Sequence, residues 1–510
     1  MASSQTIPVH VEVSLLPSCV VGDEAIREAV QLLLRELGTY VYRDGPLDFS
    51  SSDLLSQCAD TVTVVDTDDY TNSAGVSFWQ GDLHAHIYRL CEDGPEVEMI
   101  DGTGEEEVPA CDQWLLPSAK LQGLWESLVL ERGIKNHLLE YATTAMLFTD
   151  KGVSKNVISW NRVVLLHGPP GTGKTSLCKA LAHKLSIRLG ERFSNGQLLE
   201  INAHSLFSKW FSESGKLVHR LFTYILELAD DEESLVCVLI DEVESLTAAR
   251  SAALGGNEPS DALRVVNAVL TQIDNLRERD NVLILTTSNV SEAIDMAFVD
   301  RADIKQYIGL PPASARYEVL RSCLEELVRV GIIAPPQYLP PTLSKAVELV
   351  GGSGGHKASR TSIATGGESC AAGGVEGMIR MKPDHTNTHR ATQQETEGVG
   401  RDEGVKCEGG PCKGGDGERI SRIQDDMDLG AAAERTQRVG AQELVGDLVQ
   451  IAGLTEGLSG RALRKLPFQA HAFFVQRQVC NLQRFLWALD QAAHRELGSR
   501  LDLNTCEQGS

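Results

Sequence analysis

Eight consecutive residues have the composition and the setting of a phosphate-binding loop. They follow an apolar run at 163–166 and precede Leu177, Leu181 and Leu185 at four-residue spacing, which predicts the order strand, loop, helix. Backbone N–H groups of such a loop, together with the helix N-terminus, bind phosphate oxygens. The loop residues are Gly168, Pro169, Pro170, Gly171, Thr172, Gly173, Lys174 and Thr175.

Two side chains of this loop have the chemistry that a nucleoside triphosphate requires. Lys174 would place a fixed positive charge on the β- and γ-phosphates, and Thr175 would offer its hydroxyl to Mg²⁺. The sequence therefore predicts ATP and Mg²⁺ as the ligands of this site.

Polar residues end two further apolar runs. Residues 235–240 lead into Asp241 and Glu242, and residues 282–287 lead through Ser288 into Asn289. In-line hydrolysis needs a metal clamp and an oriented water, so we expect Asp241 to hold Mg²⁺ and Glu242 to polarise the water. Asn289 would bind the γ-phosphate or the attacking water from the neighbouring strand.

Positioning these groups requires a doubly covered parallel sheet. Between about residues 160 and 312 strand-like and helix-like segments alternate, which predicts an α/β fold with helices on both faces. Ligands of such sheets lie at the carboxyl ends of the strands, where these motifs fall. The predicted organisation is a small α/β domain at 1–100, a linker and leading helix at 101–150, the large nucleotide-binding domain at 151–312, and a helical lid at 313–350 and 441–505.

The N-terminal pattern places strands near 9–15, 61–66 and 82–90 and a helix near 23–37. The acidic stretch 96–107 is interpreted as a solvated linker, followed by one amphipathic helix over 121–147.

A glycine-rich segment, 351–440, divides the lid. It holds 19 of the 46 glycines and no Phe, Tyr or Trp, and such a composition favours disorder. His385, His389, Cys407 and Cys412 have no compact zinc spacing, so the sequence predicts no zinc site there.

Composition narrows the class of partner. The formal net charge of −24 argues against broad binding to nucleic-acid backbones, and no apolar run approaches a membrane span. Scattered cysteines suit reduced thiols, and we expect a protein of the nucleus or cytosol with protein partners.

Together these motifs resemble those of the AAA+ P-loop ATPases, with residues 457–461 similar to a lid motif. Residues 206–214, 260–274, 298–307 and 457–468 more narrowly resemble the pachytene-checkpoint remodellers of that superfamily. The resemblance implies a homohexamer in which Arg301 is a finger reaching the neighbouring subunit's ATP. It also implies that Arg461 senses the γ-phosphate and that Trp210 grips substrate in the central pore. Ile304 stands where many relatives carry a second arginine, and Arg464 remains a spare candidate.

The same resemblance implies a biological role. It predicts that the N-terminal domain docks HORMA-domain proteins, directly or through a HORMA-like adaptor, and that the ring opens them. Expected consequences are disassembly of the mitotic checkpoint complex, removal of meiotic HORMA proteins from chromosome axes, and meiotic recombination. Chromosomes and kinetochores are the implied sites of action.

Two other functions remain open. A microtubule-severing or other AAA protein remodeller would have a similar pore motif, although severing motors usually have a basic linker and this chain is acidic there. A catalytically dead scaffold is the other alternative, and intact nucleotide-contact positions argue against it.

Overall fold

The computed structural model describes residues 7–36, 41–42, 44–66, 76–77, 81–101, 107–131, 133–203, 214–245, 260–289, 294, 296–351, 440 and 442–507. Trp210, residues 352–439 and the four His and Cys positions considered for zinc lie outside the described residues. No helix in the described part combines the length and apolar character that a membrane crossing requires.

A seven-stranded sheet forms the centre of the nucleotide-binding domain, in the order β13-β9-β12-β11-β10-β8-β7. Five neighbouring strands are parallel. They are β13 (Ile304–Tyr307), β9 (Val163–His167), β12 (Val282–Ser288), β11 (Ser234–Asp241) and β10 (Asn195–Asn202). The predicted parallel α/β sheet is confirmed.

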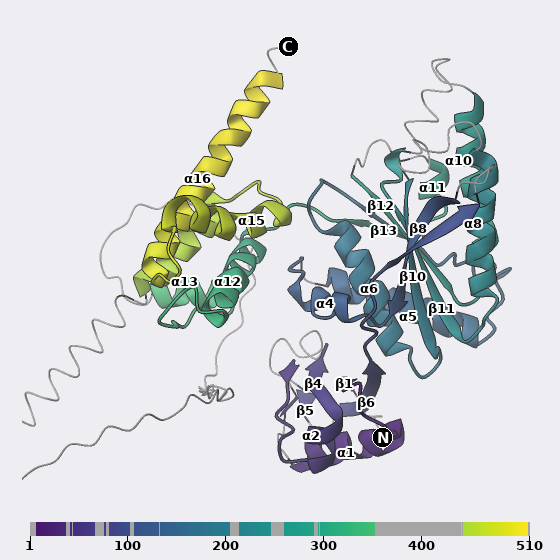
Figure 1. The fold of residues 1–510 in the computed structure, drawn as a ribbon, viewed down its shortest axis with the longest axis horizontal. Coiled ribbons are helices and arrows are strands. Elements are labelled where there is room, and N and C mark those ends of the chain that lie inside the picture. Colours follow the sequence, from purple (N-terminus) through teal and green to yellow (C-terminus); the bar gives the residue numbers. More distant parts are fainter. Residues whose placement is uncertain are drawn as a thin grey trace, which may run out of the picture. The chain divides into compact units, whose positions relative to one another are not determined.

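Helices cover both faces of this sheet (Figure 1). Leu235, Cys237 and Leu239 of β11 pack in the cluster that includes α5 (Ile134–Asp150) and α6 (Lys174–Arg188). The alternate residues of β11 pack in the cluster of α8 (Ser214–Ala229) and α10 (Ser260–Leu276). Burial on both faces explains why these strands are continuous apolar runs in the sequence.

The acidic segment after residue 95 is a strand pair, so its interpretation as a linker is wrong. β7 (Glu96–Asp101) pairs antiparallel with β8 (Glu107–Leu116), and β8 pairs antiparallel with β10. The hairpin therefore extends the edge of the nucleotide-binding sheet.

The single helix predicted over 121–147 is also wrong. The segment contains a 3₁₀ turn (Ala119–Leu121), the short α4 (Leu124–Ser127) and then α5. Gly123 and Gly133 precede the two α-helices with φ of 72° and 83°, a left-handed conformation that interrupts a helix and that glycine adopts without strain.

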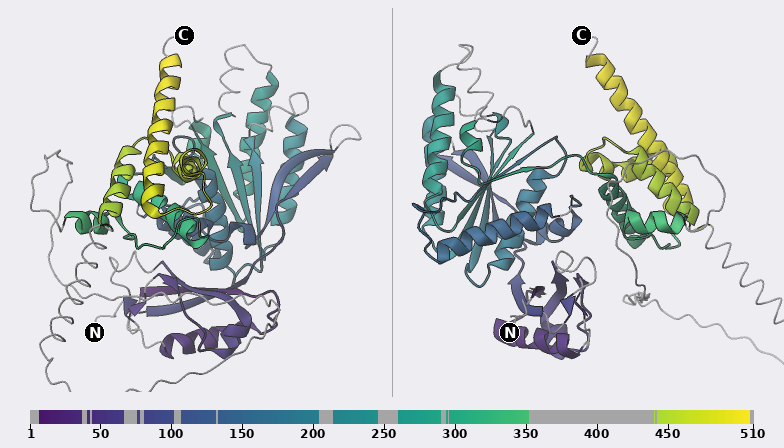
Figure 2. Two further views of the ribbon diagram at one scale, coloured as in Figure 1. Left: turned by 60° about the vertical axis from the view of Figure 1, so that its left-hand side comes forward. Right: turned by 180° about the vertical axis from the view of Figure 1, so that it is seen from behind.

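The N-terminal domain has the predicted small α/β architecture. β1 (Ile7–Leu15) lies between β4 (Ala59–Val65) and β6 (Gly81–Arg89), and β3 (Gly45–Pro46) flanks β4. Helices α1 (Asp23–Glu36) and α2 (Asp53–Cys58) pack on one face of this sheet (Figures 1 and 2). A two-stranded pair, β2 (Val41–Tyr42) and β5 (Val76–Ser77), completes the domain.

The lid is helical and is assembled from both sides of the glycine-rich segment. Helices α12 (Ala313–Arg329) and α13 (Leu343–Gly351) precede that segment. A helix at 442–454, α15 (Gly460–Ala470), a π-helical turn (His471–Val475) and α16 (Leu482–Glu507) follow it. Tyr317, Leu324, Leu448, Leu466 and Phe485 share one buried cluster, so residues from both sides form a single core.

Candidate nucleotide-binding and hydrolysis site

The predicted phosphate loop connects β9 to α6. Gly168, Gly171 and Gly173 have φ of 143°, 76° and 98°. A Cβ on Gly168 would lie 2.2 Å from the backbone oxygen of Ile308, so only glycine fits between the ends of β9 and β13. The loop conformation thus depends on the glycine spacing seen in the sequence.

Lys174 begins α6 and is buried. Its Nζ donates hydrogen bonds to the carbonyl oxygens of Gly168 and Pro169, at 2.9 and 2.8 Å. Burial lowers the pKa of this ammonium below its ordinary value, and the nearby carboxylates of Glu244, Asp241 and Glu242 offset only part of that shift. A buried ammonium at the N-terminus of the helix that follows a phosphate loop suits a polyphosphate ligand.

Thr175 and Asp241, the two residues predicted to hold Mg²⁺, lie together. The Thr175 hydroxyl donates to the two carboxylate oxygens of Asp241, at 2.9 and 3.2 Å. Hydroxyl and carboxylate oxygens are hard donors of the kind that Mg²⁺ prefers. The donor set therefore fits the predicted metal.

Glu242 and Asn289 also meet. The Asn289 side chain donates through Nδ2 to Glu242 Oε1 at 3.4 Å, and the Asn289 backbone N–H donates to Glu244 Oε1 at 3.1 Å. Parallel strands β11 and β12 are direct neighbours, which brings their carboxyl ends to one edge of the sheet. The structure thus brings Lys174, Asp241, Glu242 and Asn289 into one cluster.

The lid contributes α15 to this site. The Arg461 amide donates to the carbonyl oxygen of Gly171 at 3.0 Å, and Ser459 caps the helix by accepting from the Ala462 amide at 3.4 Å. The Arg461 side chain is exposed, and Arg464 donates to the Ser127 carbonyl oxygen. Arg461 is therefore placed at the phosphate loop by its own backbone.

Two adjoining cavities flank the loop, of about 350 and 390 Å³. Both are lined by residues of the loop, the segment before α5 and the lid. The shared lining residues are Val129, Leu130, Thr172, Val319 and Gly460. Apolar walls beside a phosphate-binding loop provide the surface that a nucleobase requires.

Arg301 lies away from this cluster and has a partner in its own chain. Its guanidinium forms a bidentate pair with Asp274, at 2.9 and 2.6 Å, and also donates to the Ala297 carbonyl oxygen at 2.7 Å. Burial alone would raise the pKa of Asp274. The hydrogen bonds and charges of Arg301 and Arg277 outweigh burial and hold this pKa below its ordinary value. The structure therefore orients the Arg301 guanidinium by a carboxylate of its own chain.

Sequence reasoning missed two contributors to the cluster, Glu244 and Thr287. Thr287 donates to Asp241 and accepts from the Glu242 amide at 3.2 Å. A hydroxyl residue near the end of an otherwise apolar strand is the signal that could have indicated it.

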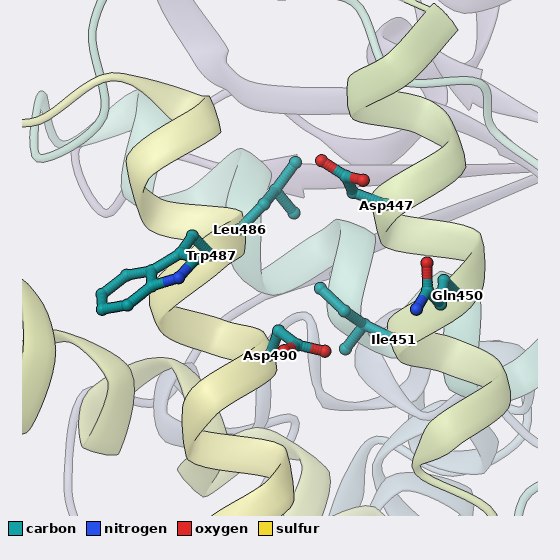
Figure 3. A pocket seen from close by; sticks show the side chains of 6 residues that line it. All are labelled: Asp447, Gln450, Ile451, Leu486, Trp487 and Asp490. Atoms are coloured by element: carbon teal, nitrogen blue, oxygen red, sulfur yellow. The ribbon is translucent and has the colours of Figure 1, made fainter.

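A further cavity, of about 210 Å³, lies between α16 and the helix at 442–454 (Figure 3). Burial, Glu443 and Asp490 raise the pKa of Asp447 there. Its lining has two carboxylates and no phosphate-binding cation, so it does not resemble a nucleotide site. The lining residues are Asp447, Gln450, Ile451, Leu486, Trp487 and Asp490.

Comparisons with known families cover all three parts of the chain. The model of the ATPase family associated with various cellular activities matches residues 164–310. The TRIP13-like AAA+ ATPase lid C-terminal domain matches 312–364 and 418–497, and the TRIP13 N-terminal domain matches 4–93.

Relatives match along nearly the whole chain. The pachytene checkpoint protein 2 homolog of Oryza sativa subsp. indica is 44% identical, with 97% of this chain and 89% of that protein covered. The homolog of Homo sapiens is 42% identical, with 97% and 94% covered. The solved structure of C. elegans PCH-2 has a TM-score of 0.64 at 29% identity, with 96% of this chain and 99% of that chain covered.

Proposed function

Because the chain belongs to the pachytene checkpoint protein 2 family of AAA+ ATPases, we propose that it forms a homohexameric ring that opens HORMA-domain proteins. The chain is an ATPase, and its nucleotide site is the observation that carries the proposal. Lys174 and Thr175 of α6, Asp241 and Glu242 at the end of β11, and Asn289 after β12 lie in one cluster.

Each member of the cluster has a role in hydrolysis. The loop Gly168–Thr175 binds the phosphates, and Lys174 neutralises charge on the β- and γ-phosphates. Mg²⁺, held through Thr175 and Asp241, supplies electrostatic stabilisation of the transferred phosphoryl group when it is bound. Glu242 orients the attacking water, and Asn289 contacts the γ-phosphate or that water.

Two arginines would couple hydrolysis to the ring. Arg301 acts on the ATP of the neighbouring subunit, and its bidentate pair with Asp274 orients the guanidinium. Arg461 senses the γ-phosphate. Support for that role comes from the bond between its amide and Gly171, which links α15 to the phosphate loop.

Substrate handling is assigned to two other regions. Trp210 grips an extended chain in the pore, since an aromatic side chain offers apolar contact that is independent of sequence. The N-terminal domain receives HORMA-domain proteins, directly or through a HORMA-like adaptor. The proposed processes are disassembly of the mitotic checkpoint complex, removal of meiotic HORMA proteins from chromosome axes and meiotic recombination, in the nucleus and cytosol and at chromosomes and kinetochores.

A conversion assay tests this proposal. Purified protein is mixed with a HORMA-domain protein in its closed, partner-bound state, with and without an adaptor, and partner release is followed after ATP addition. We expect release that depends on ATP. Glu242→Gln should retain the substrate in an ATP-dependent pull-down, whereas Lys174→Ala, which weakens nucleotide binding, should not.

ATP hydrolysis by the purified chain with neither conversion nor capture of any HORMA-domain protein would refute the proposed substrate. Release of tubulin from microtubules under the same conditions would instead favour the severing alternative.

A further inference from the structure

Two consecutive threonines of β12 are buried and bond in different directions. Thr286 and Thr287 are 3% and 1% exposed. The Thr286 hydroxyl donates to the Val164 carbonyl oxygen of β9 at 3.0 Å, whereas the Thr287 hydroxyl donates to Asp241, at the end of β11. Only the second threonine therefore touches the acidic pair.

The Thr287 hydroxyl restrains the Asp241 carboxylate. Asp241 Oδ1 accepts from both Thr287 and Thr175. The terminal torsion of an Asp side chain has broad energy wells, so hydrogen bonds rather than rotamer preference fix the plane of the carboxylate. Two donors on one oxygen define that plane and orient the second oxygen.

The same hydroxyl restrains the backbone of Glu242. Glu242 has a φ of 60°, a left-handed conformation that is strained for a residue with a Cβ. Its N–H donates to Thr287 Oγ1 at 3.2 Å, and the next N–H, of Val243, donates to the Thr287 carbonyl oxygen at 2.9 Å. Thr287 thus accepts hydrogen bonds from both backbone N–H groups of the turn that positions the Glu242 side chain.

We infer that Thr287 is a positioning residue of the hydrolysis site, whose one hydroxyl fixes both the Asp241 carboxylate and the Glu242 turn. This inference rests on the roles proposed above for Asp241 and Glu242. Asn289 lies two residues after Thr287 and contacts Glu242. Thr287 therefore ties both acids to the chain segment that carries Asn289.

Replacing Thr287 with Val tests the inference, because Val keeps the branched shape and removes the hydroxyl. Mutation of a residue that hydrogen-bonds a metal ligand typically lowers metal affinity or activity by about 10- to 100-fold. We expect kcat to fall by about that factor. Nucleotide affinity in EDTA, measured with a fluorescent ADP, should stay within about twofold because the phosphate loop is untouched, while the affinity gained on adding Mg²⁺ should fall by about tenfold. Thr287→Ser should restore both quantities to within about threefold, since it returns the hydroxyl.

Thr286→Val is the matched control, because it removes a hydroxyl from the adjacent buried position without touching either acid. We expect its kcat and its Mg²⁺-dependent affinity to match the parent. An equal loss in Thr286→Val and Thr287→Val, or no recovery in Thr287→Ser, would overturn the inference in favour of a general disturbance of β12.

Glu242→Gln separates this inference from the proposed function. If Glu242→Gln is inactive while Thr287→Val keeps the parent's kcat and Mg²⁺-dependent affinity, the inference fails and the roles of the acids stand. If Glu242→Gln remains active, the role of Glu242 fails, and the Mg²⁺-dependent affinity of Thr287→Val still decides whether Thr287 positions Asp241.

Discussion

Gly168 shows how one missing side chain shapes the nucleotide site. Its φ of 143° and the 2.2 Å separation between a built Cβ and the Ile308 oxygen leave no room for alanine. The obstruction is backbone at the end of β13, which is itself bonded to His167 through the Ile308 amide at 2.8 Å. Relief would require the two strand ends to separate.

Gly168→Ala should therefore destabilise the fold by on the order of 2–4 kcal/mol and weaken nucleotide binding by at least about tenfold. Denaturant unfolding and a fluorescent-nucleotide titration measure the two effects. Gly453→Ala is the control, since that glycine is exposed in a lid helix with nothing within 4 Å of a built Cβ. Equal stability and affinity in the two variants would contradict the close approach.

At the scale of single residues, the sequence predicts much of the site. Asp241, Glu242, Asn289 and Lys174 follow from the ends of apolar runs and from the loop composition, and the structure brings them together. The sequence shows Thr287 as a hydroxyl residue near the end of an apolar strand, but its contact with both acids depends on the pairing of β11 with β12, which joins distant parts of the chain.

Among elements, doubly buried strands were predicted well because their apolar runs are unbroken. The β7–β8 pair was not, for a physical reason. Val97 and Met99 of β7 are 55% and 41% exposed and alternate with charged residues, which is also how a solvated segment looks. What makes β8 a strand is its pairing with β10, a contact between distant parts of the chain.

The glycine-rich segment gives a prediction at this scale. Replacing residues 351–440 with a short Gly/Ser linker should leave ATPase activity within about twofold, because closing a loop costs only about (3/2)RT ln n. The buried lid cluster uses residues on either side of the segment, all of which remain. Turnover assays and size-exclusion chromatography check this, and loss of hydrolysis or assembly would show a structural role for the segment.

At the scale of the whole assembly, the proposed role of Arg301 can be tested directly. Arg301→Ala should reduce ring ATPase activity by on the order of 10³-fold or more, the range for arginine fingers acting in trans. Rings mixed from Arg301→Ala and Lys174→Ala subunits should regain some activity, wherever an intact nucleotide site meets an intact finger. Confirmed co-assembly with no recovery would indicate that Arg301 acts within its own subunit.

Trp210→Ala should separate hydrolysis from mechanical work. ATPase activity should persist, because the cluster around Asp241 is intact, while opening of a closed HORMA protein should be lost. Calorimetry distinguishes a pore residue from a core residue, because truncating a core Trp would reduce the free energy of unfolding by about 3–5 kcal/mol. A large fall in melting temperature with poor assembly would therefore assign Trp210 to the core instead of the pore.

The divided lid also has a consequence for how the protein is made. Tyr317, Leu320 and Leu324 are buried against side chains such as Leu448, Leu463 and Phe485, which the ribosome adds only after the whole glycine-rich segment. At roughly 5–20 residues per second, those apolar side chains wait on the order of ten seconds for their partners. The first lid helices are thus where a chaperone would be needed during synthesis.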